Sequence, residues 1–209
     1  MIKGAKLKFF LSGIITVAVA SVIAGVLWNN GLRDRLFPKR WGVVESGKIC
    51  RSGKINPAIM EGVLRKNNIR IIINLTGADG LSKAESDAAG KLGVEIFSYK
   101  FLEGGLSSAE DYSEVLKKVS DSRREGKPVL IHCNAGENRT GGVVAVYRVL
   151  VEGKSPEYAY AELLRYGWKK DSMMIAHLNE NMKDISALLV KNGVIDKVPD
   201  PLPQLPVRR

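Results

Sequence analysis

The sequence predicts an α/β fold: a three-layer α/β/α arrangement with a central, largely parallel sheet, preceded by one N-terminal apolar segment. Three observations support this prediction. Short apolar runs typical of strands alternate along the chain with segments of helical period. The helices begin at recognisable caps, and proline and glycine mark the connections. Of the 209 residues, 45% are hydrophobic, which suffices for one domain with a substantial core and one appendage.

Five short strands are expected. Their predicted ranges are 41–45, 48–51, 69–75, 94–101 and 128–132. The third range contains the run Ile71–Asn74, which is apolar except at its end. The last follows Lys127 and is a buried strand from Val129 to His132.

The helices are predicted from their first residues. Asn56 is placed as an N-cap, with Pro57 at the first helical position. The stretch Ser107–Glu110 is interpreted as a capping box that opens a helix through about Asp121. Further helices are expected over 142–151, from Ser155 onward, and over 171–190. The proline-rich tail cannot continue a helix, so it is expected to be disordered or clamped to the surface.

Residues 1–28 are predicted to be a signal peptide or a transmembrane anchor. No charge occurs from Phe9 to Trp28, and a helix of that length matches a hydrocarbon core of about 30 Å. Ala18-Val19-Ala20 before Ser21 also fits a cleavage site behind a basic N-terminal region. Either outcome would place the rest of the chain at the membrane or outside the cytoplasm, on the periplasmic or extracytoplasmic side.

The basic residues of the linker 29–40 support the opposite orientation, because the positive-inside rule would keep them in the cytoplasm. Residues 1–40 hold seven cations and one aspartate, and therefore carry +6 of the net charge of +10. Most of the basic charge thus lies where it would favour anionic lipid headgroups. The cations do not cluster with aromatic residues, and nucleic acid is not expected as a partner.

Cys133 and Arg139 lie six positions apart, between the last predicted strand and a helix. The five residues between them are Asn134, Ala135, Gly136, Glu137 and Asn138. This spacing lets backbone N–H groups converge on an anion at the positive end of the helix. The same field stabilises a thiolate, so Cys133 is the expected nucleophile. Arg139 supplies a bidentate fork for two phosphoryl oxygens, and the Thr140 hydroxyl can hydrogen-bond the sulfur.

At these residues the chain resembles the cysteine-based phosphatases of the tyrosine and dual-specificity superfamily, whose signature is H-C-x5-R-[S/T]. The matching residues are His132, Cys133, Gly136, Arg139 and Thr140. The resemblance extends from about Trp41 to about Leu189 and is strongest to the compact bacterial dual-specificity-type branch, some members of which are exported. It implies the cysteine-phosphatase fold, with a catalytic domain over 41–192 followed by a tail over 193–209.

The resemblance implies hydrolysis of phosphomonoesters through a cysteinyl-phosphate intermediate, without a cofactor. No metal-ligand spacing or dinucleotide motif is present in the sequence, and no metal is expected. The family also carries a general acid on a mobile loop before the capped helix. No aspartate stands there; Glu103, followed by two glycines as hinges, is the candidate. Asp111 and Asp79 remain alternatives, and the capping box accounts for Glu110.

Four further residues have expected roles. In the family the histidine before the nucleophile orients the loop, so His132 is expected to do so here. Arg51 resembles an arginine kept beside the first strand, and it is expected to support the loop. His177 is interpreted as a packing residue. Cys50 is expected near the core, with a transient bridge to Cys133 as the alternative.

The variable loop positions bear on substrate choice. They contain Glu137 and no cation, whereas relatives that act on inositol phosphates tend to carry lysines there. Highly phosphorylated inositols are therefore disfavoured. The expected partner is a phosphorylated protein, with phosphotyrosine favoured. A lipid phosphate such as phosphatidylglycerophosphate, or a pseudophosphatase that only binds phosphorylated partners, remains an alternative.

Overall fold

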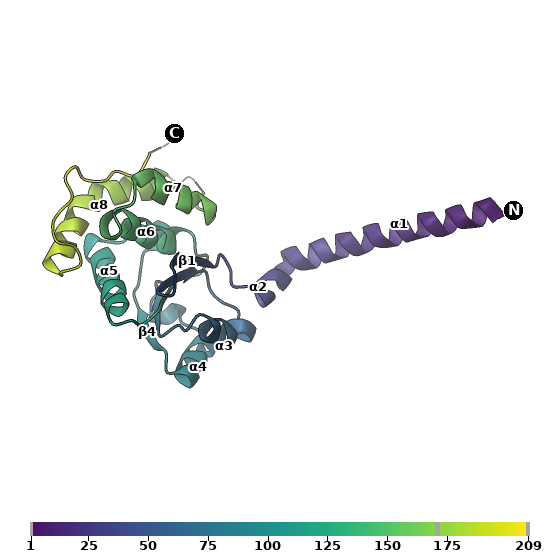
Figure 1. The fold of residues 1–209 in the computed structure, drawn as a ribbon, viewed down its shortest axis with the longest axis horizontal. Coiled ribbons are helices and arrows are strands. Elements are labelled where there is room, and N and C mark those ends of the chain that lie inside the picture. The colour runs from purple at the N-terminus through teal and green to yellow at the C-terminus, as the bar shows by residue number, and fades with distance from the viewer. Residues whose placement is uncertain (1, 170–171, 208–209) are drawn as a thin grey trace. The chain divides into compact units, whose positions relative to one another are not determined.

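The computed structural model describes residues 2–169 and 172–207, without the side chains of residues 2–13, 27, 29, 30 and 172. The chain divides into two compact units, one ending at Phe37 and the other beginning at Pro38. The second unit is a sheet covered by helices on both faces (Figure 1).

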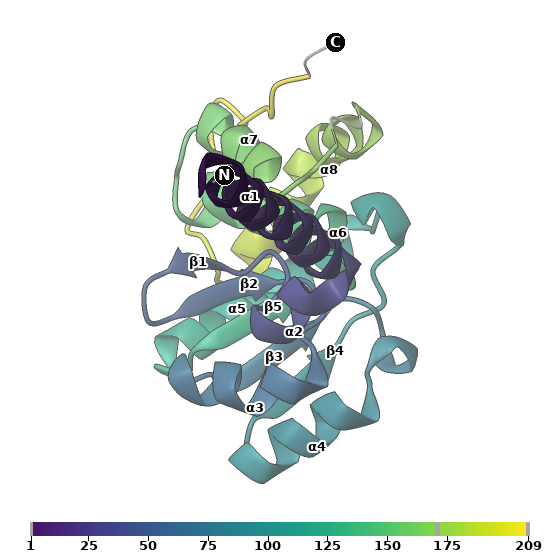
Figure 2. The same ribbon diagram turned by 90° about the vertical axis from the view of Figure 1, so that its right-hand side faces the viewer.

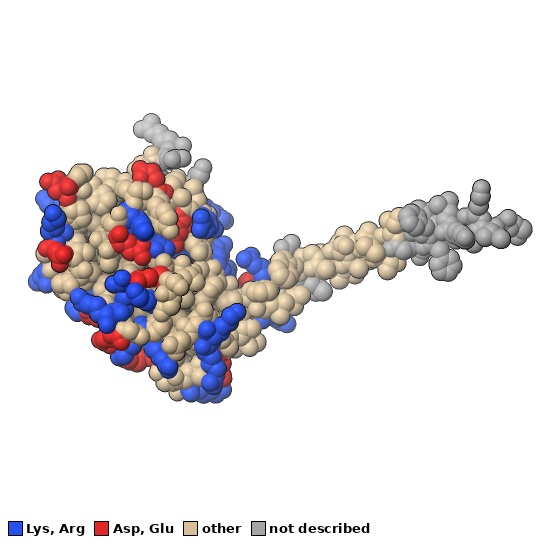
Figure 3. Space-filling view, viewed as in Figure 1, with Lys and Arg blue, Asp and Glu red and all other residues tan. Residues whose placement is uncertain are grey.

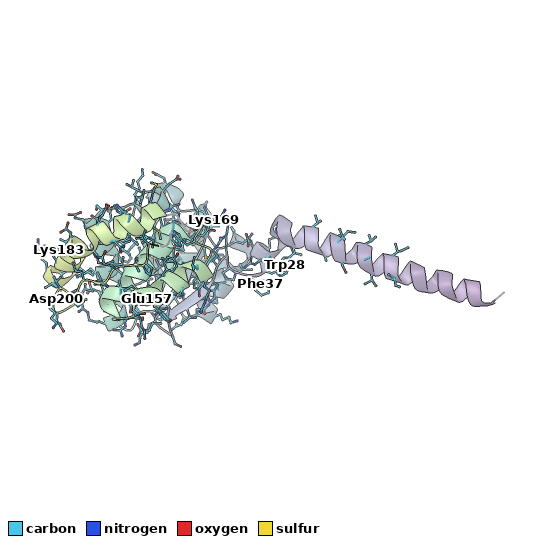
Figure 4. All side chains as sticks on the ribbon, turned by 90° about the horizontal axis from the view of Figure 1, so that it is seen from above. Trp28, Phe37, Glu157, Lys169, Lys183 and Asp200 are labelled. Carbon is cyan, nitrogen blue, oxygen red and sulfur yellow. The ribbon has the colours of Figure 1, made fainter. Side chains whose placement is uncertain are left out.

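The first unit is helical. It comprises α1 (Ile2–Leu27), the π-helical turn η1 (Trp28–Leu32) and α2 (Arg33–Leu36). The rings of Trp28 and Phe37 approach to 6.2 Å between centroids (Figure 4). Among the described residues, no helix combines the length and apolar character that a membrane span requires. The predicted segment Phe9–Trp28 falls partly outside the described side chains, and its role stays a prediction.

The sheet has the strand order β1-β2-β5-β3-β4, as Figure 2 shows. The strands are β1 (Gly42–Glu45), β2 (Ile49–Ser52), β3 (Ile71–Asn74), β4 (Glu95–Ser98) and β5 (Val129–His132). Only β1 is antiparallel to its neighbour; the other pairings are parallel. The predicted α/β fold with a largely parallel sheet is confirmed.

The strand register places four carboxyl ends in one row. Ser52 and Asn74 both lie opposite His132, and Ser98 lies opposite Asn74. Ligands of parallel α/β sheets bind beyond the carboxyl ends of the strands. The loops that follow these four residues therefore form the edge at which a site is expected.

Two hydrophobic clusters flank the sheet. The smaller one lies under α3 (Pro57–Lys66) and α4 (Lys83–Leu92). The larger one lies under α5 (Ala109–Arg124), α6 (Asn138–Val146), α7 (Pro156–Arg165) and α8 (Ser172–Lys191). Successive residues of β5 alternate between them: Leu130 packs into the smaller cluster and Ile131 into the larger. Burying each such side chain contributes about 1.5–3 kcal/mol, so the central strand holds both layers together.

Helix α5 begins one cap later than predicted. The capping box is made by Ser108 and Asp111, each accepting the other's backbone N–H at 3.1 Å. Ser107 is not available as a cap because its hydroxyl accepts the Leu102 N–H at 2.8 Å. The prediction that Glu110 closes the box is therefore wrong, and Asp111 has that role. By contrast, the predicted cap at Asn56 is confirmed, since its side chain accepts the Ala58 N–H.

The start of α6 also differs from expectation, whereas the tail agrees with one of its two predicted states. Helix α6 begins at Asn138 rather than at residue 142, because the end of the signature loop already has helical geometry, and it continues as the π-helical turn η4 (Tyr147–Val151). The tail is clamped: Asn179 on α8 exchanges two hydrogen bonds with the Leu205 backbone, at 2.9 and 2.8 Å. The Leu205 side chain is buried in the larger cluster.

Candidate active site

Cys133 lies at the base of a tight loop between β5 and α6. Its side chain is buried, and its sulfur accepts the Gly136 N–H at 3.2 Å. Gly136 has a φ of 78°, and a Cβ there would come within 2.5 Å of the Gly53 nitrogen. Glycine is therefore required at this position both by conformation and by packing. The first N–H groups of α6, which have no partner within the helix, begin directly after the loop.

The carbonyl groups of three successive loop residues are held from outside the loop. The bonds run from the Lys54 N–H to the Asn134 carbonyl (3.0 Å), from Arg40 Nη1 to the Ala135 carbonyl (3.0 Å) and from Arg51 Nη2 to the Gly136 carbonyl (2.8 Å). In a trans peptide the carbonyl and the following N–H point in opposite directions. Fixing these carbonyls outward turns the N–H groups inward, which creates an anion-binding concavity.

Arg51 is the buried member of this set, with 1% of its surface exposed. Its guanidinium stacks on the Tyr166 ring at 4.0 Å from the centroid. Burial lowers the pKa of Arg51 to about 10, with Glu162 as the leading opposing influence. Arg51 is therefore still a cation at neutral pH, and the expected contact with the loop is present.

Arg139 and Thr140 occupy the first turn of α6. Arg139 is partly exposed, and its Nη1 lies 3.4 Å from the Leu75 carbonyl after β3. Leu75 is itself fixed by donating its N–H to the His132 carbonyl at 2.9 Å. The Thr140 hydroxyl is buried and has no hydrogen-bond partner among the described residues. Because its contact with the Leu75 carbonyl is long, the Arg139 guanidinium is free to turn toward an oxyanion.

His132 points away from the face of the sheet on which Cys133 packs. Its Nε2 lies 2.7 Å from Glu85 Oε1 on α4, and both side chains are almost fully buried. Its link to the site therefore runs through the strand backbone. Sequence reasoning missed Glu85, because the Ser82-x-x-Glu85 pattern is a capping signature; Ser82 does cap the helix, while the carboxylate turns to the histidine instead.

The two cysteines are both free and lie in different clusters. Cys50 packs under α3 and α4, and burial raises the pKa of its thiol to about 11. Cys133 packs on the other face of the sheet. The predicted core position of Cys50 is confirmed, whereas a bridge between the two sulfurs would require opening the sheet.

Glu103 begins the 3-10 turn η3 (Glu103–Gly105), and its side chain is exposed. The turn lies beside the start of α6, because a Cβ on Gly105 would come within 3.2 Å of the Asn138 carbonyl. The Gly105 carbonyl accepts the Tyr112 hydroxyl at 2.7 Å. The structure thus brings the Glu103 turn to the edge of the signature loop and anchors one side of it.

The segment just after this turn is anchored by a residue with an unexpected role. His177 Nε2 lies 2.7 Å from the Ser107 carbonyl, although the sequence predicted only packing for this histidine. No local signal marks this contact, because the two residues are 70 positions apart.

Of the two alternative acids, one is engaged in a helix cap and the other is exposed. Asp111 caps α5, as described above. Asp79, in the 3-10 turn η2 (Ala78–Gly80), is 91% exposed and lies 3.7 Å from the Lys100 ammonium. Glu103 therefore remains the candidate general acid, because its turn lies beside the start of α6.

Comparison with known proteins agrees with this geometry. The family model described as dual specificity phosphatase, catalytic domain, matches residues 54–191. The dual specificity protein phosphatase TpbA of Pseudomonas aeruginosa is 35% identical over 98 residues, 47% of this chain and 40% of that protein. The chain thus spans about two fifths of the length of the curated relatives it matches.

Solved structures share the fold. P. aeruginosa TpbA in complex with pTyr has a TM-score of 0.57 at 21% identity, over 73% of this chain and 95% of that one. PTPMT1 in complex with PI(5)P has a TM-score of 0.59 at 19% identity, over 70% and 97%. These likenesses show a common architecture, and the family match covers most of the second unit. The chain belongs to the dual specificity phosphatase family, whose catalytic domain it carries.

Proposed function

We propose that this chain is a cysteine-dependent protein phosphatase that hydrolyses phosphomonoesters, with phosphotyrosine as the favoured group. One observation carries the proposal. The carbonyls of residues 134–136 are all bound from outside, so the inward N–H groups surround the position above the Cys133 sulfur. A dianion bound there would meet the nucleophile, the start of α6 and the Arg139 guanidinium together.

The reaction proceeds in two displacements. The Cys133 thiolate attacks phosphorus, an S–P bond forms, and the ester P–O bond breaks while Glu103 gives a proton to the leaving oxygen. Water then attacks the same phosphorus as the Glu103 carboxylate removes its proton. The S–P bond breaks, inorganic phosphate leaves, and both groups return to their starting states.

The exposed position of the proposed general acid, Glu103, favours aryl phosphates as substrates. Glu103 is exposed, and within the described residues no ion pair or hydrogen bond holds its carboxylate toward the loop. A phenolate leaves with less protonation than an alkoxide, so phosphotyrosine depends least on this acid. The pTyr bound to the related TpbA structure supports the same choice.

A lipid phosphate is the second candidate. The described apolar side chains of α1 are exposed, Val17 by 67%, and residues 1–40 carry a net charge of +6. Such a segment favours proximity to an anionic membrane. We therefore propose membrane anchoring or export through residues 1–28, which would bring lipid phosphates within reach. The PI(5)P bound to PTPMT1 supports this alternative.

Initial rates decide between these substrates. Phosphotyrosine peptide, phosphoserine peptide and phosphatidylglycerophosphate vesicles would be compared at equal phosphate concentration, with EDTA present and Cys133→Ser as the blank. The highest kcat/KM on the phosphotyrosine peptide is the expected result. A preference for the vesicles would establish the lipid alternative, and rates equal to the blank on all three would leave only a phosphate-binding protein.

A further inference from the structure

Arg40 lies outside the signature and outside every strand, yet its guanidinium contacts the signature loop twice. Nη1 donates to the Ala135 carbonyl at 3.0 Å, and Nη2 forms an ion pair with the Glu137 carboxylate. Both side chains are largely covered, with 28% and 19% of their surfaces exposed. The pair therefore lies in a partly desolvated position, where it is screened less than a surface ion pair.

The surrounding backbone is shaped to hold this side chain. Arg40 has a φ of 49°, a left-handed conformation that non-glycine residues rarely adopt. The preceding residue is fixed, since the Lys39 carbonyl accepts the Gly53 N–H at 2.7 Å. On the far side, a Cβ at Gly167 would come within 2.9 Å of Arg40 Nε. The left-handed backbone of Arg40 and the absence of a side chain at Gly167 together make room for the Arg40 guanidinium. Backbone strain of this kind argues for a functional role of Arg40.

The charge of the loop explains what that role is. Between Cys133 and Arg139 the sequence contains one ionisable residue, Glu137, and it is acidic. A carboxylate beside the concavity opposes the binding of a phosphate dianion. Arg40 cancels this charge and, through the Ala135 carbonyl, also fixes the peptide whose N–H faces inward. Over the face of the molecule shown in Figure 3, acidic and basic side chains are interspersed.

We propose that Arg40 is a positioning residue of the phosphate loop, which orients the Ala135 peptide and neutralises Glu137 so that the loop accepts a dianion. This inference rests on the proposed function, because it concerns how tightly the same site binds phosphate. Each contact of Arg40 has its own effect: the ion pair neutralises Glu137, and the hydrogen bond orients the Ala135 peptide. In a protein without Arg40, replacing Glu137 by a neutral residue removes the charge that needed neutralising. It does not restore the lost hydrogen bond to the Ala135 carbonyl.

The test uses the full chain and five variants: Arg40→Ala, Arg40→Lys, Glu137→Gln, the double variant Arg40→Ala/Glu137→Gln, and Arg35→Ala as a control that removes a linker cation without a described loop contact. The readouts are KM and kcat on p-nitrophenyl phosphate, the inhibition constant of orthovanadate, and the thermal midpoint. The inhibition constant does not depend on the fraction of folded enzyme, so it separates anion binding from stability.

Arg40→Ala is expected to raise KM and the vanadate inhibition constant about tenfold or more, because it removes one charge-assisted hydrogen bond. The change in kcat should be smaller. The double variant should recover part of the lost affinity for vanadate. Arg40→Lys should have values between those of the wild type and Arg40→Ala, since an ammonium restores the charge without the planar fork. Arg35→Ala should match the wild type.

Two results would overturn the inference. In the first, Arg40→Ala binds vanadate as tightly as Arg35→Ala does. In the second, the double variant recovers none of the lost affinity, so that Arg40 and Glu137 act independently. The proposed function has a separate control, Cys133→Ser, measured beside these five variants. If the wild type hydrolyses p-nitrophenyl phosphate and Cys133→Ser does not, the phosphatase assignment stands whatever the outcome for Arg40.

Discussion

The Cys133 side chain is buried, and its sulfur accepts the N–H of Gly136, from the loop that would bind the substrate. Replacing it with serine removes the nucleophile and leaves the outward-held carbonyls and Arg139 in place. We expect Cys133→Ser to abolish turnover of p-nitrophenyl phosphate while still binding vanadate or phosphate, as measured by calorimetry. Activity above roughly one per cent of wild type would exclude a covalent role for Cys133, since loss of a nucleophile removes the whole displacement pathway.

The role of Glu103 as general acid is proposed from the position of its turn beside α6. If it is the general acid, Glu103→Gln should flatten the alkaline limb of the pH–rate profile. It should also slow an alkyl phosphate such as glycerol phosphate much more than an aryl phosphate, because general-acid help is worth roughly 10² to 10⁴ and matters most for poor leaving groups.

The matched controls for this experiment are Asp111→Asn and Asp79→Asn. Asp111→Asn is expected to weaken only the cap of α5, and Asp79→Asn to change little, since that side chain is exposed. If Asp111→Asn shows the leaving-group dependence and Glu103→Gln does not, the acid is Asp111 and the present assignment is wrong.

At the scale of elements, the turn η3 depends on α5 and α8. Tyr112 is fully buried, and burial raises the pKa of its hydroxyl, which therefore donates to the Gly105 carbonyl throughout the physiological range. His177 contacts the Ser107 carbonyl, two residues after the turn. Of the two glycines expected as hinges, Gly105 is therefore itself held by Tyr112, and Gly104 precedes both anchored carbonyls.

Tyr112→Phe tests whether this anchoring matters for catalysis. The substitution leaves the Gly105 carbonyl unpaired, at a cost of about 1–3 kcal/mol in the free energy of unfolding. We expect the turn to lose its fixed position, so that turnover of alkyl phosphates falls more than turnover of aryl phosphates. Denaturant unfolding and the ratio of the two rates measure these effects, with the exposed Tyr158→Phe as the control. An unchanged ratio would mean that the bond serves stability alone.

At the scale of the molecule, Glu45 joins the edge strand to the helical layer. Its carboxylate accepts hydrogen bonds from Arg123 on α5 (2.6 Å), from Lys48 (2.6 Å) and from the Tyr147 hydroxyl (3.0 Å). Burial alone would raise the pKa of Glu45, but these bonds outweigh it and lower the pKa to about 2 from an ordinary value of 4.5.

This shift predicts a pH dependence of stability. Because the folded-state pKa is depressed, the contribution of Glu45 is complete above pH 4.5 and is lost as the pH falls toward about 2. Glu45→Gln should lower the free energy of unfolding at pH 7 by about 1–3 kcal/mol and flatten its decline between those pH values. Urea unfolding across this range measures both. A variant that keeps the wild-type slope would show that other carboxylates govern the acid transition.

The placement of the whole chain is tested by reporter fusions. We expect alkaline phosphatase fused after Glu45 to be active and a cytoplasmic reporter fused there to be inactive, because the apolar segment from Phe9 to Trp28 would export the residues on its C-terminal side. N-terminal sequencing tests cleavage before Ser21. The opposite reporter pattern would place the catalytic domain in the cytoplasm, as the positive-inside rule predicts from the linker cations.

The sequence alone determined the features that depend on local pattern. The α/β alternation, the helix start at Asn56 and the phosphate-loop signature from His132 to Thr140 are all encoded within short windows. Apolar periodicity, caps and the spacing of a nucleophile from an arginine each act over a few residues, so they can be recognised before the chain folds. These features suffice to predict the fold class and the family.

Only the tertiary structure decided which side chains surround the loop. Arg40 reaches Ala135 across 95 positions, and His177 reaches Ser107 across 70, whereas the contact of Arg51 with the loop was expected from the family resemblance. In the sequence Arg40 is one of several linker cations. No periodicity relates such residues, because their contacts depend on the order of strands in the sheet and on the left-handed turn that directs one guanidinium toward the loop.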